Sequence, residues 1–180
     1  MGPLTTALGL ASPAGKRARL SILIFHRVLP APDPLFPGEP DASRFDEMLG
    51  WLTSWFNILP LDEAVRRRAE GTLPARAAAI TFDDGYADNR VVALPVLQRH
   101  GITATFFIAT GFLDGGSMWN DRIIAAMRHC SRSALDLATL ELGTHPLGTA
   151  QARREAIDAL IGKVKYLPGP QRVEIANRIA

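Results

Sequence analysis

The stretch AITFDDGYADNR, residues 79–90, decides the fold, because it joins an apolar run to a sharp turn that carries two adjacent carboxylates. The run AAAITF, residues 77–82, is short and continuous, which is typical of a strand buried on both faces in a parallel sheet. Gly85 follows Asp83 and Asp84, permits a sharp turn, and lets a ligand approach the backbone closely. Functional residues of parallel α/β folds follow the carboxyl ends of strands, so we predict that both aspartates lie at a functional edge.

Apolar runs and helical periodicity predict three further strands and four helices around this stretch. The expected strands are LSILIF (20–25), which also favours burial on both faces, FNILP (56–60) and ITATFFIAT (102–110). The expected helices are SRFDEMLGWLTSW (43–55) with Ser43 as N-cap, LDEAVRRRAE (61–70), a helix from Pro95 to His100, and WNDRIIAAMRH (119–129). Because strands and helices alternate as far as residue 128, we predict a parallel α/β layout, either an open sheet or part of a barrel.

The composition divides the chain into three parts. Residues 1–19 are rich in Gly, Ala, Pro and Ser and are expected to form a flexible lead-in, whereas residues 20–128 carry the α/β pattern. From residue 129 the pattern changes: SALDLATLELG is ambiguous, and TAQARREAIDALIGKVKYL and PQRVEIANRIA are two expected helices with no strand between or after them. We therefore expect residues 129–180 to be a mainly helical insertion or tail of the same domain.

Composition and charge also exclude several classes of protein. A hydrophobic content of 47% is typical of a globular domain, and 20 basic against 18 acidic residues lack the basic excess of nucleic-acid binders. No apolar run approaches the roughly 18 residues that span a bilayer. The basic residues near the N-terminus follow the mildly apolar stretch, the reverse of a secretory signal, and Cys130 is the only cysteine. We expect a cytoplasmic protein without a transmembrane segment or a nucleic-acid partner.

Asp83 and Asp84 are adjacent like charges, which repel, so structure alone gives no reason for the pair. Two carboxylates at a strand end can divide the work of hydrolysis: one ligates a hard or borderline metal, and the other takes a proton from metal-bound water. The plain alternative is a turn in which the aspartates only cap the following helix. A magnesium site for phosphoryl transfer is a further alternative, but no Gly-rich phosphate loop or suitably placed lysine supports it.

Three segments together resemble the polysaccharide deacetylase family with its NodB-type domain: ITFDDGY (80–86), ATFFIATGF (104–112) and LSILIFHRV (20–28). TFDDG is the first motif of that family, and it is specific when a strand precedes it and a helix and an ATFF strand follow. The resemblance covers residues 20–128. In addition, GFLDGGSMWND (111–121) is similar to an insertion loop of bacterial members linked to exopolysaccharide synthesis.

The resemblance implies a distorted (β/α) barrel, of which this chain would supply about four parallel strands and a helical C-terminal tail. It implies hydrolysis of N-acetyl, sometimes O-acetyl, groups on an N-acetylated sugar or exopolysaccharide, with bound zinc or a similar divalent metal. By the same resemblance, Asp83 is the general base and Asp84 is a metal ligand. His26 is expected to line the pocket unless it only anchors a loop, and Tyr86 could reach a sugar hydroxyl or merely pack.

A second family motif, H-x-x-x-H, completes the metal site, and this chain does not contain it. The four histidines are His26, His100, His129 and His145, and no two are four or five positions apart. His100 and His129 are expected to end helices, and His145 is expected in a loop. A zinc site takes about three protein ligands, so we predict the N-terminal part of a longer deacetylase. The alternative is an inactive relative that binds a glycan or a partner protein.

The predicted half barrel leaves a strand edge and an apolar face without cover. We therefore predict that the isolated chain is marginally stable or prone to aggregation, unless the helical tail covers the exposed face. Circular dichroism and urea unfolding of the purified chain test this prediction, and a monomer that unfolds cooperatively would contradict it.

Overall fold

The computed structural model describes residues 2–180, which form two compact units with separate hydrophobic cores. The first unit holds the chain up to Pro32 together with Gly38–Ala109, and the second holds Asp33–Pro37 together with Thr110–Ala180. The chain thus divides earlier than the predicted change of character at residue 129. The reason is that the helix before residue 129 buries its apolar side chains among the C-terminal helices.

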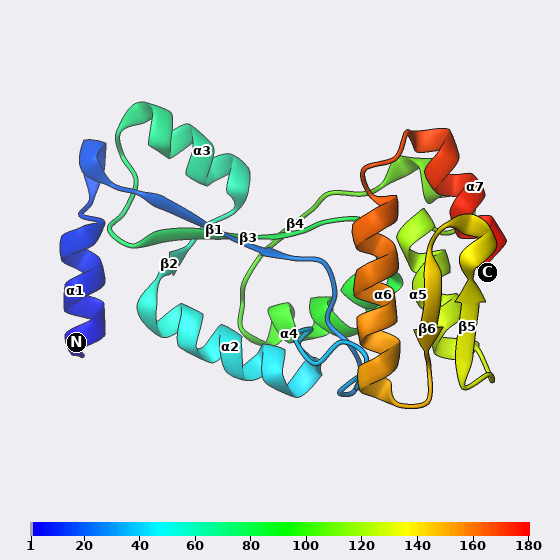
Figure 1. Cartoon of the computed structure of the whole chain (residues 1–180). Helices are drawn as coiled ribbons and strands as arrows, with labels where there is room; N and C mark the ends of the chain where they lie inside the picture. The colour runs from blue at the N-terminus through cyan, green and yellow to red at the C-terminus, as the bar shows by residue number, and fades with distance from the viewer. Residues whose placement is uncertain (1) are drawn as a thin grey trace. The chain divides into compact units, whose positions relative to one another are not determined.

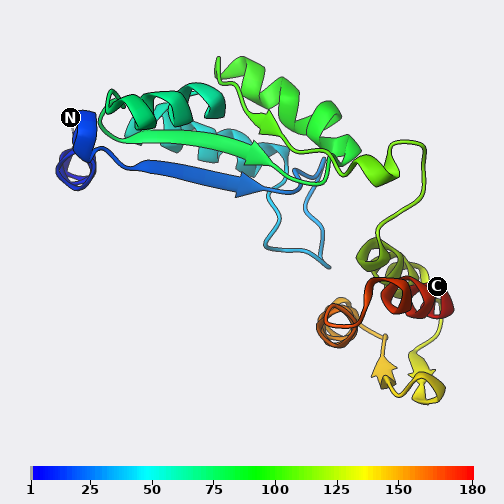
Figure 2. The ribbon, with the colours of Figure 1, turned by 90° about the horizontal axis from the view of Figure 1, so that it is seen from above.

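A four-stranded parallel sheet is the framework of the first unit (Figure 1). Its strands are β1 (Leu20–Phe25), β2 (Asn57–Ile58), β3 (Ala77–Phe82) and β4 (Thr105–Phe106). β1 pairs with the whole of β3, and Figure 2 shows the two running side by side in the same direction. The other edge of β3 is shared, since β2 pairs beside Ala77 and β4 beside Phe82. The predicted α/β class with four parallel strands is confirmed, although β2 and β4 are shorter than predicted.

One face of the sheet packs against α2 (Ala42–Trp55) and α4 (Leu94–Arg99) and forms the core of this unit. Aromatic rings dominate the core: the ring centroid of Phe82 lies 4.9 Å from that of Phe106 and 5.5 Å from that of Phe25. All six residues of β3 are buried, as predicted, because strands pair on both of its edges and helices pack on both faces (Figure 1). The strand that precedes the acidic pair is therefore buried along its whole length and paired on both edges.

The opposite face of the sheet is only partly covered. α3 (Leu61–Glu70) packs there through Ala64, which is buried with Ala77 at the beginning of β3. Further along this face, Ile22 and Ile24 of β1 are 48% and 60% exposed. The prediction that LSILIF is buried on both faces is therefore wrong. Within residues 2–180, β1 pairs with β3 alone, and a border strand lacks the cover that a central strand receives from both sides.

Two helix starts differ from the expected ones. The predicted flexible lead-in instead contains α1 (Pro3–Ala11) and a 3₁₀ turn at Gly15–Arg17. The helix forms because the segment is rich in the helix formers Ala and Leu. Met1 lies outside the described residues. α2 is capped by Asp41 instead of Ser43, and the Asp41 side chain accepts a hydrogen bond from the backbone N–H of Arg44. After the acidic turn, a π-helical segment at Asn89–Ala93 leads into α4.

The second unit contains three helices and a hairpin. Its elements are α5 (Trp119–His129), β5 (Ala134–Leu137), β6 (Gly143–Pro146), α6 (Ala150–Val164) and α7 (Gly169–Ile179), with 3₁₀ turns at Thr110–Phe112 and Ala138–Leu140. The predicted helical C-terminal region is confirmed, with no strand between or after α6 and α7, and the segment SALDLATLELG, ambiguous in the sequence, supplies β5 of the hairpin. Its strands have four residues each and join through Glu141 at a φ of 58°, a local geometry that periodicity does not reveal. None of the helices within residues 2–180 has the length and apolarity that crossing a membrane requires.

Asp46 of α2 ties that helix to the end of α4. Its carboxylate accepts a hydrogen bond from Arg99 at 3.0 Å and lies 3.1 Å from His100 Nε2. The Arg99 bond, and next the His100 bond, hold the pKa of Asp46 below its usual value. A lowered folded-state pKa stabilises the fold above the unfolded-state pKa, and this stabilisation is lost as the pH falls through the folded-state value.

We expect Arg99→Ala to raise the pKa of Asp46 toward its usual value, because the largest cause of the lowering is removed. An NMR titration of the Asp46 carboxyl measures this shift. Arg66→Ala removes an arginine of α3 that pairs with Glu70 and serves as the control. A pKa of Asp46 that is the same in all three proteins would contradict the assigned cause.

Candidate functional site

Asp83 and Asp84 lie directly after β3, where backbone hydrogen bonds hold them to the ends of both neighbouring strands. The N–H of Asp83 donates to the carbonyl of Phe25 at 2.9 Å, which extends the ladder with β1. On the other side, the N–H of Ala109 donates to the carbonyl of Asp84 at 3.2 Å. Both aspartates are half-buried. The acidic pair therefore lies at the carboxyl edge of the sheet on a fixed main chain.

The turn that carries the pair has an unusual backbone. Asp84 has a φ of 71° and Gly85 a φ of 74°, so two successive residues are left-handed. For a residue with a side chain this conformation costs about 1–2 kcal/mol, and aspartate tolerates it better than most residues. A Cβ atom at position 85 would also lie 2.9 Å from Cδ1 of Ile108. Position 85 therefore needs glycine both for its backbone conformation and for the close approach of Ile108.

We expect Gly85→Ala to lower the free energy of unfolding by about 1–2 kcal/mol, because alanine is strained at this φ and contacts Ile108. Urea unfolding measures the change. Gly50→Ala is the matched control, since Gly50 lies inside α2 with open space for a Cβ, and there alanine should stabilise by about 0.5–1 kcal/mol. Changes of the same sign in both variants would contradict this account of the turn.

Tyr86 lies close to the acidic pair along the chain, and His26 follows β1 at the same edge of the sheet. His26 is exposed and directly follows Phe25, the residue that bonds to the backbone of Asp83. Tyr86 is half-buried one residue after Gly85, and the guanidinium carbon of Arg27 lies 4.7 Å from the centre of its ring. One face of the Tyr86 ring is therefore covered by Arg27.

Three further polar residues lie beside the turn, and the sequence patterns do not predict them as site residues. Asp88 and Asn89 are buried, with 7% and 4% exposure. Arg27 forms an ion pair with Asp88, and the side-chain amide of Asn89 donates to the carbonyl of His26. The sequence does carry a signal for them, because an Asp–Asn pair opens an otherwise apolar helix and an arginine directly follows the FH end of the first strand.

A pocket of about 300 Å³ lies beside the turn and belongs to the first unit alone. Its lining is mostly apolar and includes Leu94, Phe106 and Ile108 together with Gly85 and Tyr86. The structure thus brings two of the predicted site residues, Gly85 and Tyr86, to one pocket. Asp83, Asp84 and His26 are not among its lining residues and remain at the strand ends.

The donors present do not fit a zinc ion or a similar metal on their own. Residues 2–180 contain no group of three His, Cys, Asp or Glu side chains that could hold a metal ion. His145 lies in β6 instead of the expected loop, and its Nε2 atom is 3.0 Å from the carbonyl oxygen of Leu142. Asp83 and Asp84 supply two carboxylates at the turn, and this falls short of the roughly three protein ligands of a zinc site.

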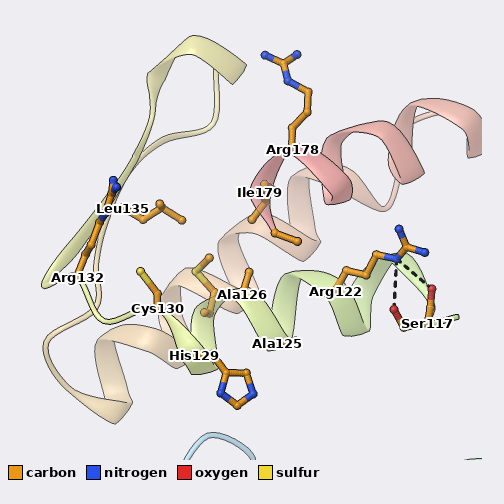
Figure 3. Close-up of a pocket in the computed structure, with 12 residues that line it drawn as sticks. Ser117, Arg122, Ala125, Ala126, His129, Cys130, Arg132, Leu135, Arg178 and Ile179 are labelled. Atoms are coloured by element: carbon orange, nitrogen blue, oxygen red, sulfur yellow. Dashed lines mark hydrogen bonds between the residues drawn. The ribbon is translucent and has the colours of Figure 1, made fainter.

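A second pocket, of about 670 Å³, lies in the second unit along α5 and the end of α7 (Figure 3). Three arginines line it, but they do not converge on one point. Arg122 Nε donates to the carbonyl and the hydroxyl of Ser117, both at 3.3 Å, whereas Arg132 and Arg178 extend in different directions (Figure 3). This pocket brings no catalytic pair together, so the acidic turn is the candidate site.

Comparisons with known proteins point to one family. The family model described as "Polysaccharide deacetylase" matches residues 70–131, a range that contains β3, the acidic turn and β4. YxkH of Bacillus subtilis, assigned by its name to the same family, is 30% identical over 95 residues, which are 52% of this chain and 33% of that protein. The poly-beta-1,6-N-acetyl-D-glucosamine N-deacetylase of Staphylococcus aureus is 30% identical over 106 residues, 58% of this chain and 37% of that protein. The structure of IcaB from Ammonifex degensii aligns at 27% identity with a TM-score of 0.47, over 62% of this chain and 48% of that one.

The range matched by the family model contains the acidic turn. The chain spans about a third of the length of the curated relatives it matches. Within that third, the family model covers the central strand and the TFDDG turn that the structure places at its carboxyl end. The chain is thus similar to part of a polysaccharide deacetylase domain, over a range that includes the acidic turn.

Proposed function

We propose that the chain is part of an enzyme that hydrolyses N-acetyl groups on a carbohydrate. The observation that supports this most directly is the pair Asp83–Asp84, which follows the buried central strand and lies within the range matched by the family model. The Staphylococcus aureus relative is named for N-deacetylation of poly-beta-1,6-N-acetyl-D-glucosamine. On this support we propose an N-acetylated sugar or exopolysaccharide as the substrate.

Asp83 is proposed as the general base of this reaction. Its carboxylate takes a proton from the attacking water, the water oxygen bonds to the acetyl carbon, and the C–N bond breaks as the nitrogen gains a proton. The products are acetate and a sugar with a free amine. The bond from the Asp83 N–H to Phe25 supports this role, because it fixes the main chain from which the base projects. His26 and Tyr86 are proposed to line the substrate pocket.

Asp84 is proposed as one ligand of a divalent metal, zinc in the first place. Residues 2–180 hold no set of three metal-binding side chains, so this proposal requires further ligands from outside these residues, in a longer chain or a partner chain. Metal-dependent hydrolysis is accordingly proposed for the assembled enzyme. The alternative is a relative without activity that binds a glycan or a partner, and the shortage of metal ligands is the observation that favours it.

Acetate release from N-acetylglucosamine oligosaccharides tests the proposal. The protein is produced from its complete reading frame and assayed with added zinc and with a chelator, and binding of the same oligosaccharides is measured on the same sample. Acetate release that stops in the chelator supports metal-dependent hydrolysis. Oligosaccharide binding without release favours the inactive relative, and a protein that neither binds nor releases acetate contradicts both.

A further inference from the structure

Arg27 connects the end of β1 to the segment that follows the acidic turn. Its Nε and Nη2 atoms lie 2.8 Å and 2.7 Å from the same carboxylate oxygen of Asp88. The Asp88 side chain is 8% exposed and that of Arg27 is 40% exposed, so this ion pair is shielded from water on its acidic side. Two charge-assisted hydrogen bonds to a buried carboxylate hold more firmly than an exposed surface pair.

Two further contacts run between the same segments. The guanidinium of Arg27 lies over the ring of Tyr86 at 4.7 Å. The amide Nδ2 of Asn89 donates to the carbonyl of His26 at 2.9 Å and to Oδ1 of Asp88 at 3.3 Å. Residues 26 and 27 are thereby attached to residues 86, 88 and 89. These contacts hold the chain after the turn, whereas the bond between Asp83 and Phe25 holds the chain before the turn.

The acidic turn needs such an attachment because of its backbone. Asp84 and Gly85 are both left-handed, so the turn is held in a conformation that Asp84 does not favour by itself. Before the turn, Asp83 is fixed by the bond to Phe25, and after it the Arg27 contacts and the hydrogen bond from Asn89 to His26 reach across from the end of β1. A reacting group displaced by about 1 Å can lose 10²-fold in rate, so a loosely held turn would be costly.

We propose that Arg27, acting through Asp88, is a positioning residue that holds the Asp83–Asp84 turn in place. Its effect on the reaction rate rests on the proposed function, whereas its effect on the turn does not. Arg27 is not proposed to touch the substrate in this role. The two effects can therefore be measured separately.

Amide hydrogen exchange, followed by NMR, measures the effect on the turn. Arg27→Met keeps the apolar stem and removes the guanidinium, and Asp88→Asn removes the carboxylate charge. Both variants are expected to exchange the amide protons of Asp83 and Asn89, which are bonded to the carbonyls of Phe25 and Tyr86, about tenfold faster or more. Arg66→Ala, which breaks the exposed pair with Glu70, is the control and should leave these rates unchanged.

Two results of this experiment overturn the proposal. The first is unchanged exchange at Asp83 and Asn89 in both variants. The second is an equal acceleration at Ile102, which follows α4 and whose amide donates to the carbonyl of Leu97 in that helix, because that would mean general loosening of the unit. Arg27→Lys retains a positive charge and should restore part of the protection at Asp83 and Asn89, which a loss of packing alone would not explain.

Acetate release measures the effect on the reaction. In Arg27→Met the kcat is expected to fall about tenfold or more with KM changed less than about twofold, and Arg27→Lys should recover part of the kcat. An unchanged kcat in an active enzyme overturns the positioning role in catalysis, even when exchange is faster. An enzyme that releases no acetate in any form contradicts the proposed function, and the exchange rates then still decide whether Arg27 holds the turn.

Discussion

Asp83→Asn is expected to lower the kcat of acetate release by about 10²–10⁴-fold, because asparagine cannot take a proton from the attacking water. Asparagine has nearly the size of aspartate, and the hydrogen bond to Phe25 comes from the main chain. The turn should therefore keep its shape, and the loss should appear in kcat more than in KM. Acetate release by the protein from its complete reading frame, at several oligosaccharide concentrations, measures both constants.

The matched control is Asp62→Asn in the first turn of α3, an exposed aspartate of the same unit that is not part of the acidic turn. It should leave kcat within about twofold of the unsubstituted protein. Oligosaccharide binding by Asp83→Asn should persist, because the substituted group acts on the water. A variant that keeps its full rate would remove Asp83 from the proposed role, and the acidic pair would then be a structural turn.

Phe82→Ala is expected to have the largest effect on stability, about 3–5 kcal/mol of unfolding free energy. Phe82 is fully buried at the end of β3, and its ring contacts those of Phe25, Phe45 and Phe106 at centroid distances of 4.9 to 5.9 Å. Alanine would leave a cavity among these rings directly before the acidic pair. A loss of this size is a large fraction of the stability of a typical domain.

Tryptophan fluorescence during urea unfolding reports on the first unit alone if Trp119 of the second unit is replaced by phenylalanine. The remaining tryptophans, Trp51 and Trp55, both lie in α2 of the first unit. Phe107→Ala is the control, since Phe107 follows β4 and is 51% exposed, and it should cost less than about 1 kcal/mol. Equal losses for the two substitutions would show that the aromatic cluster does not dominate this core.

Local patterns in the sequence predict β3 and its turn well, because the information lies within a few consecutive residues. Six apolar or small residues in a row match a strand buried on both faces, and the adjacent Asp83, Asp84 and Gly85 match a turn at its end. The same reasoning fails for β1, whose apolar run looks alike although Ile24 is 60% exposed. A run of apolar residues does not show which strand is central, since that depends on pairing with distant parts of the chain.

In the candidate site, too, features formed by neighbouring residues can be predicted from the sequence, whereas contacts between distant residues cannot. Adjacent carboxylates after a strand are visible in the sequence, but the ion pair of Arg27 with Asp88 joins residues 61 positions apart. The left-handed backbone of Asp84 cannot be predicted from the sequence in the same way, because glycine is the residue that reliably indicates this conformation. The four-residue strand that holds His145 was missed because so short a segment carries little periodicity.

The central position of β3 has a consequence for how the chain is made. Each strand pairing of the sheet within residues 2–180 involves β3, and Leu20 pairs with Ala77, which is 57 residues later. Ribosomes add about 5–20 residues per second, so a newly made β1 waits for roughly 3–11 s before its partner strand exists. During this interval LSILIF is an unpaired apolar segment without a charge. We therefore expect nascent chains to depend on chaperones during synthesis, before the stability of the folded protein has any effect.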